Sequence, residues 1–174
     1  MANKEALRDL QHRLAERMRS ARSQPVAASW LAVECAGTAV LLPLQDAGEI
    51  FPLSALHQLP HANPWFAGVA NLRGALHSVI DLAAFLGLRS ETLSSERRLV
   101  ALNPHLEMHC AVMVDRLLGL RHAQDLTVLQ DEPGSQQSKP AFAGARLQDM
   151  GGRSWQVIDL RALARYEGFL KIVA

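Results

Sequence analysis

Residues 4–22 carry an apolar pattern with helical spacing. The apolar positions recur every three or four residues, so that they form one stripe on a cylinder that is otherwise charged. Pro25 then ends the helical pattern. We expect an N-terminal amphipathic helix and linker over residues 1–27, packed on the chain itself, on a partner or on a membrane surface. The stripe consists of Leu7, Leu10, Leu14 and Met18.

From Trp30 onward the pattern changes to short apolar runs separated by turn residues, which is typical of β-strands. The run WLAVECAGTAVLLPL contains Ala36-Gly37 and predicts a hairpin. Further strands are predicted at GEIFPL, GVANLR, ALHSVID, RRLVALN and MHCAVMVDRLLGLR, and loops at LHQLPHANPW and QDEPGSQQSKP. The ending LRALARYEGFLKIVA predicts a C-terminal helix. Its expected apolar face consists of Leu160, Leu163, Ala164 and Leu170.

An internal repeat relates the two halves of this β-rich region. PWFAG at 64–68 recurs as PAFAG at 140–144, and VIDL at 79–82 recurs as VIDL at 157–160. The second copy is two residues longer between these landmarks, and the difference fits the turn in which Gly151-Gly152 replaces Arg73-Gly74. Each half therefore predicts a hairpin, a strand, a loop, a second hairpin and a short helix.

Asp81 and Asp159 occupy equivalent positions at the end of the repeat. Each follows a β-branched strand and precedes a helix-forming run, which is typical of a helix N-cap. A catalytic carboxylate pair is the alternative. Their equivalence in the repeat favours two structural caps.

Two related all-β units predict two small β-barrels packed side by side. We expect one domain over residues 28–174 that consists of these two pseudo-repeated halves.

Charge and composition exclude several classes of function. The 174 residues include 18 basic and 17 acidic side chains, a net charge of +1, and 5% aromatic residues. This balance is unlike that of a nucleic-acid-binding protein or of one drawn to an anionic membrane. The sequence has no secretion-signal pattern and no apolar run of about 18 residues, which predicts a cytoplasmic protein without membrane insertion. Cys35 and Cys110 lie in apolar runs and are expected to be buried, reduced thiols.

The chemical motifs give little support for an enzyme or for a bound cofactor. PHLEMHC contains His105, Glu107 and His109, which would share one face of a strand and offer metal ligands. The adjacent Pro104 favours a solvated turn instead. No phosphate-binding loop, dinucleotide-binding pattern or nucleophile elbow is present. We therefore expect no catalytic residue, no metal and no cofactor.

The stretch GVANLRG places a charged residue between two glycines. In an extended strand Val69, Asn71 and Arg73 would share one face. Gly68 and Gly74 permit unusual backbone angles or close approach. An arginine anchors either an internal acid or an acid of a partner. The second copy of the repeat, GARLQDMGG, has no such arginine, which favours a partner-facing role.

These segments resemble the CheW-like family of chemosensory coupling proteins. The family pattern of glycine, an apolar pair, Asn-Leu-Arg-Gly, an apolar strand and Ile-Asp-Leu is matched by residues 68–82. LLPLQDAGEI resembles an upstream family strand, with Glu49 at its acidic position, and AVMVDRLLGL resembles a pattern of the second half. The strand after Gly74 departs from the family, because His77-Ser78-Val79 replaces the usual Val-Pro.

The resemblance implies two SH3-like five-stranded β-barrels. It also implies a non-catalytic adaptor that couples the cytoplasmic tip of a chemoreceptor to a CheA-type histidine kinase in a membrane-associated array. The N-terminal extension and the YEGFLKIVA ending resemble the PilI-like branch of type IV pilus and twitching systems, while flagellar chemotaxis stays open. A metal-binding sensor and a small-ligand-binding double barrel are the alternatives. The partner-binding residues that the resemblance implies are Arg73, Asn71, Leu72, Gly74 and Glu49.

Overall fold

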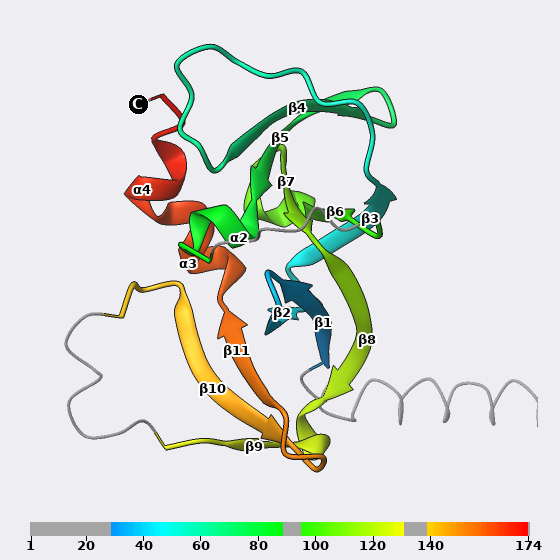
Figure 1. Ribbon diagram of the computed structural model, residues 1–174, viewed down its shortest axis with the longest axis vertical. Coiled ribbons are helices and arrows are strands. Elements are labelled where there is room, and N and C mark those ends of the chain that lie inside the picture. Colours follow the sequence, from blue (N-terminus) through cyan, green and yellow to red (C-terminus); the bar gives the residue numbers. More distant parts are fainter. Residues whose placement is uncertain (1–28, 89–94, 131–138, 174) are drawn as a thin grey trace, which may run out of the picture.

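The computed structural model describes residues 29–88, 95–130 and 139–173. The expected N-terminal helix and most of the expected loop over residues 130–140 lie outside the described residues. The described chain is mainly β, as the alternation of apolar runs and turns predicts, and its strands form two sheets (Figure 1).

One sheet has six strands in the order β8-β1-β2-β11-β10-β9. Its β1–β2 hairpin turns at Ala36-Gly37, as the sequence predicts, and β9 adds a strand to the five expected. The strands of this sheet are β1 (Ser29–Cys35), β2 (Thr38–Pro43), β8 (Arg116–His122), β9 (Leu126–Val128), β10 (Ala143–Asp149) and β11 (Ser154–Ile158).

The other sheet has five strands in the order β3-β6-β7-β5-β4. Its two outermost strands, β3 and β4, come from segments on either side of the loop over residues 53–65. The strands of this sheet are β3 (Ala47–Pro52), β4 (Phe66–Leu72), β5 (Ala75–Asp81), β6 (Arg98–Leu102) and β7 (Cys110–Val114).

The two copies of the repeat do not each form a sheet. The first hairpin, β1–β2, pairs in parallel through β2 with β11 of the last hairpin. The two middle hairpins, β4–β5 and β6–β7, pair with each other through the parallel strands β5 and β7. Each sheet thus combines one hairpin from each half of the sequence. The first and last hairpins share the six-stranded sheet, and the two middle hairpins share the five-stranded sheet.

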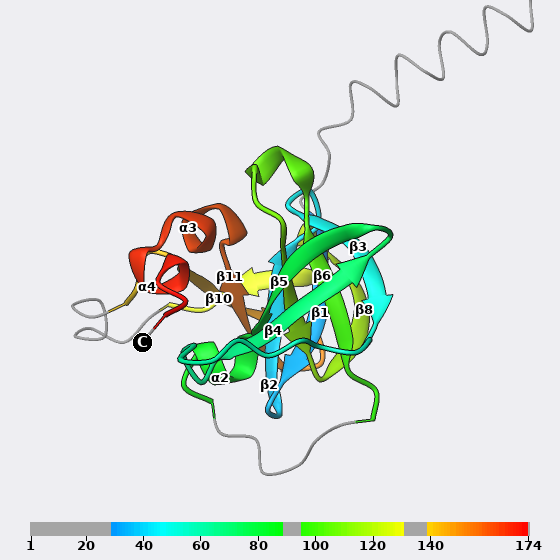
Figure 2. The same ribbon diagram turned by 90° about the horizontal axis from the view of Figure 1, so that it is seen from above.

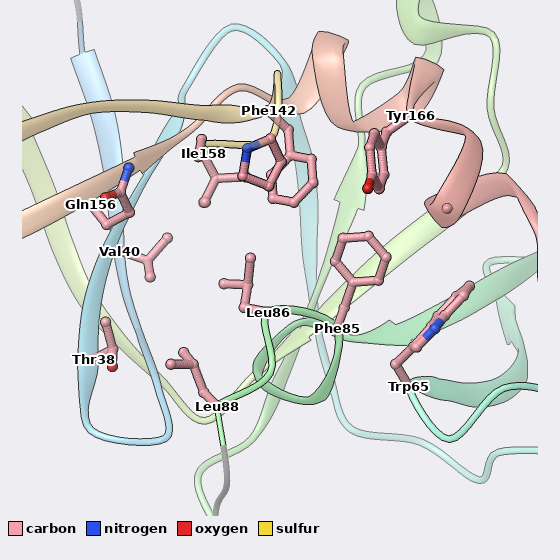
Figure 3. Close-up of a pocket in the computed structure, with 13 residues that line it drawn as sticks. Thr38, Val40, Trp65, Phe85, Leu86, Leu88, Phe142, Gln156, Ile158 and Tyr166 are labelled. Atoms are coloured by element: carbon pink, nitrogen blue, oxygen red, sulfur yellow. The ribbon is translucent and has the colours of Figure 1, made fainter. Parts of the chain in front are cut away.

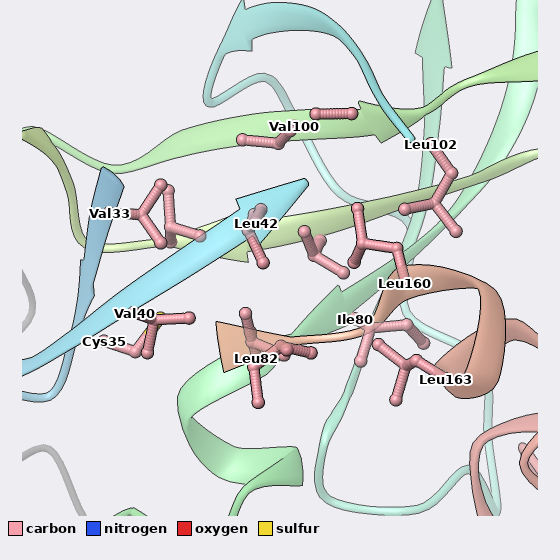
Figure 4. Close-up of a cluster of buried hydrophobic side chains, with 14 of the residues drawn as sticks. Val33, Cys35, Val40, Leu42, Ile80, Leu82, Val100, Leu102, Leu160 and Leu163 are labelled. Atoms are coloured by element: carbon pink, nitrogen blue, oxygen red, sulfur yellow. The ribbon is translucent and has the colours of Figure 1, made fainter. Parts of the chain in front are cut away.

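The largest hydrophobic core lies at the seam between the two sheets (Figure 4). Alternate residues of β2 and β7 enter this core, while the residues between them enter a smaller core on the other face of their own sheet. Val40 and Val112, for example, face the seam, whereas Leu41 and Ala111 face away from it. Both strands are therefore buried on both faces, which explains their almost continuous apolar sequences.

Three short helices gather on one side of the molecule (Figures 1 and 2). They are α2 (Leu82–Phe85), α3 (Leu160–Arg165) and α4 (Glu167–Leu170). Asp81 accepts a hydrogen bond from the Ala84 amide, and Asp159 accepts from the amides of Arg161 and Ala162, so both aspartates cap a helix.

The expected single C-terminal helix is divided at Tyr166, which lies between α3 and α4. Leu160, Leu163 and Ala164 are buried as expected. Leu170 is 52% exposed, and Phe169 occupies the buried position instead. The break changes the helical phase, so that the residue before Leu170 turns toward the core.

Both cysteines are free and buried, as their apolar context predicts. Burial raises the pKa of the Cys110 thiol to about 12. Burial also raises the pKa of the Cys35 thiol, and the negative charge of Asp115 raises it further. Both side chains are packing elements of the seam core.

Candidate functional site

The Arg73 hairpin, which consists of β4, β5 and the turn Arg73-Gly74, is the first feature of the candidate site. Both turn residues have positive φ, 51° for Arg73 and 86° for Gly74. A two-residue connection of this kind matches the right-handed twist of the strands and favours glycine or asparagine. The Gly74 amide donates to Asn71 Oδ1 at 2.7 Å, which holds the turn closed. Arg73 was expected to share one face of an extended strand with Val69 and Asn71. It lies instead in the turn, after β4 has ended at Leu72.

Arg73 forms an ion pair with Glu49 of β3. Arg73 Nη2 lies 2.5 Å from Glu49 Oε1, and the two side chains are 75% and 43% exposed. Because β3 and β4 are the two edges of the five-stranded sheet, this contact joins its opposite edges and shows that the sheet is strongly curled. Four of the five residues implied by the family resemblance thus meet on one surface, namely Glu49, Asn71, Arg73 and Gly74.

Leu72 is the exception. Its side chain is buried, with 4% exposure, among the apolar residues on the inner face of the five-stranded sheet. This burial gives Leu72 a packing role, and its partner-binding role stays a prediction. The alternation along β4 explains this, because Ala70 and Leu72 point inward while Asn71 points to the solvent.

A depression of about 320 Å³ lies beside the ion pair. Ile50 is partly exposed at its wall, and Phe51 packs on the core behind it. The surface is thus mixed, with a charged pair next to apolar side chains. Its lining consists of Glu49, Ile50, Phe51, Pro52, Ser54, Asn71, Leu72 and Arg73.

A second feature, the seam pocket, lies where the six-stranded sheet meets α2 and α4 (Figure 3). Its volume is about 540 Å³, and most of its lining is aromatic or aliphatic. Phe85 contacts the rings of Trp65, Phe142 and Tyr166 around it. The lining residues are Thr38, Val40, Trp65, Phe85, Leu86, Leu88, Pro140, Phe142, Ala143, Gln156, Ile158, Tyr166 and Gly168.

No local pattern in the sequence marked this pocket. Its residues come from β2, β10, β11, α2, α4 and the segments next to these elements and before β4, and each is typical of an ordinary core when taken alone.

His105, Glu107 and His109 do not come together as a metal site. His105 Nε2 lies 2.8 Å from Asp46 Oδ1, and Glu107 ends the short 3-10 helix η1 (Pro104–Leu106) with φ of 55°. His109 contacts His77 instead. Within the described part of the chain, no three or more histidine, cysteine, aspartate or glutamate side chains gather in an arrangement that would hold a metal ion.

Asp46 is a buried charged residue that sequence reasoning missed. Its side chain is 3% exposed and contacts two partners, His105 of η1 and Arg161 of α3, whose Nε lies 2.9 Å away. Asp46 thus connects the turn between β2 and β3 to η1, which lies between β6 and β7, and to α3, which follows β11. Its position in an ordinary turn sequence, Gln45-Asp46-Ala47, gave no indication of burial.

Of the helices in residues 29–88, 95–130 and 139–173, none combines the length and the apolar character needed to cross a bilayer.

Two β-sheets packed about a shared core, with an exposed charged hairpin on one and an apolar pocket at their seam, define a double-barrel domain. The model of the CheW-like domain matches residues 29–167, so the chain belongs to the CheW-like family. The expected family and the mainly β fold are thereby confirmed.

Two relatives refine this placement. The chain is 29% identical to Protein PilI of Pseudomonas aeruginosa over 152 residues, which cover 86% of this chain and 83% of that protein. It is also similar in structure to the scaffolding protein TtCheW of Thermoanaerobacter tengcongensis, with a TM-score of 0.64 and 18% identity. That match covers 76% of this chain and 89% of TtCheW. The resemblance to a PilI-type protein is confirmed by the first comparison.

Proposed function

We propose that this chain is a non-catalytic adaptor that couples the cytoplasmic tip of a methyl-accepting chemoreceptor to a CheA-type histidine kinase. Membership in the CheW-like family supports this function, as does the similarity in fold to a protein described as a scaffold. The similarity to PilI supports a chemosensory array that controls type IV pili and twitching. The protein would act in the cytoplasm and be recruited to such an array at the membrane.

The exposed Glu49–Arg73 pair is the observation that carries the proposal. Ion pairs as exposed as this one contribute only about 0–1 kcal/mol to stability. Arg73 also holds a left-handed backbone conformation that is unfavourable for a residue with a side chain. Arg73 destabilises the turn, and its ion pair offsets little of this effect. Binding to a partner therefore explains the arginine better than folding does.

The corresponding turn of the second repeat copy supports the same reasoning. There Asp149 Oδ1 accepts from the Gly151 and Arg153 amides, and Asp149 Oδ2 accepts from Trp155 Nε1 at 3.0 Å. This turn is stabilised by its own side chains. The Arg73 turn instead presents a guanidinium, able to form a two-pronged bond with a carboxylate, at the surface.

The seam pocket is suited to the apolar face of a helix, and we assign it to the receptor. Its volume and aromatic lining match the way in which amphipathic helices place large side chains in grooves. The Arg73 hairpin lies on the other sheet, so we assign it to the kinase regulatory domain. Two separate surfaces are what an adaptor needs in order to hold both partners at once.

A small-ligand-binding sensor is a second candidate, favoured by the volume of the seam pocket, which lies in the range of about 300–1,000 Å³ of small-molecule sites. A ligand screen by thermal shift tests it. A compound that stabilises the wild-type chain but not a variant with a filled pocket would favour the sensor.

Affinity co-purification from the native cell tests the adaptor. We expect recovery of both a CheA-type kinase and a receptor, and a pilus-associated receptor would support the pilus branch. Recovery of neither protein with a chain that is folded and abundant would contradict the proposal.

A further inference from the structure

His77 and His109 are brought together by the pairing of β5 with β7. These strands are parallel neighbours in which Ser78 pairs with Cys110, and the Ser78 amide donates to the His109 carbonyl at 3.0 Å. The two imidazole rings are 5.5 Å apart between centroids and inclined at 82°. Val79 and Ala111, two residues farther along, face the inner core of the sheet, so the histidines lie on the same face near its end.

The ring separation fits two imidazoles that share one metal ion. A Zn–N bond of about 2.0–2.1 Å places each ring centroid about 3.2 Å from the metal, and a tetrahedral angle then separates the centroids by roughly 5.2 Å. The observed 5.5 Å is close to that value.

The hydrogen bonding of His77 also prepares it as a ligand. His77 Nδ1 lies 3.0 Å from the Ala75 carbonyl oxygen, which can only accept, so Nδ1 carries the proton. In the neutral ring Nε2 then has a free lone pair. A metal-binding histidine commonly donates its other N–H to a backbone carbonyl in this way.

We propose that His77 and His109 form a two-histidine site for a divalent transition metal of the Zn²⁺, Ni²⁺ or Cu²⁺ class, with water in the remaining positions. Imidazole nitrogen suits these ions. His109 is exposed and His77 is half-buried, which leaves an entry path from solvent. This site differs from the one that the PHLEMHC pattern suggested, because only His109 of that pattern is a ligand. Bound metal would cross-link β5, which is one strand of the Arg73 hairpin, to β7.

Isothermal titration of the full, untagged chain with Zn²⁺, and separately with Ni²⁺, in a non-chelating buffer tests the site. We expect about one metal ion per chain, and an affinity at least tenfold lower in each of His77→Ala and His109→Ala. The metal should also raise the melting temperature of the wild type and not that of the double variant. His105→Ala and Glu107→Gln serve as matched controls and should bind as the wild type does.

Three results would overturn the proposal. These are no binding by a folded wild-type chain, equal binding by the wild type and the double variant, and loss of binding in His105→Ala with His77→Ala unaffected. The last result would instead assign the metal site to His105, Glu107 and His109. The titration uses no receptor or kinase, so its outcome is independent of the adaptor function.

Discussion

Arg73 and Glu49 join the two edge strands of the five-stranded sheet through an ion pair that lies open to the solvent. The residues are separated by two strand segments and a loop. The pair closes the curl of the sheet while keeping a guanidinium at the surface. Because the pair is exposed, substitution of Arg73 can test its proposed role in binding with little effect on folding.

Arg73→Glu should weaken kinase binding at least tenfold and change the free energy of unfolding by less than about 1 kcal/mol, because the ion pair is exposed. Calorimetric titration and urea denaturation measure the two effects. Arg146→Glu, an exposed charge reversal on β10, is the matched control.

The reversed pair Glu49→Arg with Arg73→Glu extends this test. If Arg73 contacts the partner directly, the reversed pair restores the ion pair but not binding. Full recovery of binding would instead assign the arginine a purely structural role.

Arg73→Asn should stabilise the turn and still weaken binding. Asparagine tolerates the left-handed conformation better than arginine, so we expect a gain of about 0.5 kcal/mol, offset in part by loss of the ion pair. Chemical denaturation and kinase titration of the same preparation check this. A variant that is less stable and binds normally would contradict our interpretation of the turn.

Gly68→Ala should destabilise the fold by about 2 kcal/mol or more. Gly68 has a φ of 136°, and an added Cβ would lie 2.7 Å from the His57 carbonyl oxygen, with which β4 forms a bridge. Gly152→Ala is the control, because its φ of 83° is also positive but no atom lies within 4 Å of the added carbon. In thermal unfolding, the melting temperature of Gly68→Ala should be well below that of Gly152→Ala. Equal decreases in melting temperature would mean that backbone strain alone is responsible.

Asp149 should make the six-stranded sheet sensitive to acid. The hydrogen bond from Trp155, with those from the Arg153 and Gly151 amides, lowers the pKa of Asp149 below its ordinary value of 3.8. The stabilisation is therefore present above that ordinary value and is lost as the pH falls through the folded-state pKa. Asp149→Asn should be less stable than the wild type at neutral pH, and the difference should narrow below a pH of about 4. Urea denaturation across this range checks the sign, and a difference that widens in acid would refute it.

Thr38→Trp should fill the seam pocket and weaken receptor binding while kinase binding stays within about twofold. Thr38 lies at the start of β2 on the same face as Val40, so a large side chain there enters the pocket. Thr127→Trp on the exposed strand β9 is the control. Pull-down with receptor and kinase fragments separates the two effects, and unchanged receptor binding would move the receptor site away from the pocket.

The sequence by itself determined the local elements. The apolar runs and the turn residues between them predicted the β1–β2 hairpin and the hairpin across Gly74, and the unusual backbone angles expected at Gly68 and Gly74 are observed as positive φ values. The extra length of the second repeat copy was placed correctly in the turn over residues 150–153. These features depend on residues that are neighbours in the chain, so propensity and periodicity are sufficient to predict them.

The tertiary structure decided which elements meet. The apolar patterns of β2 and β7 are equivalent, so the sequence did not indicate that β2 would pair with β11 and β7 with β5. The Glu49–Arg73 pair, the contact of His77 with His109 and the burial of Asp46 all follow from these pairings. Such contacts join residues far apart in the chain, and their free energy depends on packing across the whole seam, which no local pattern encodes.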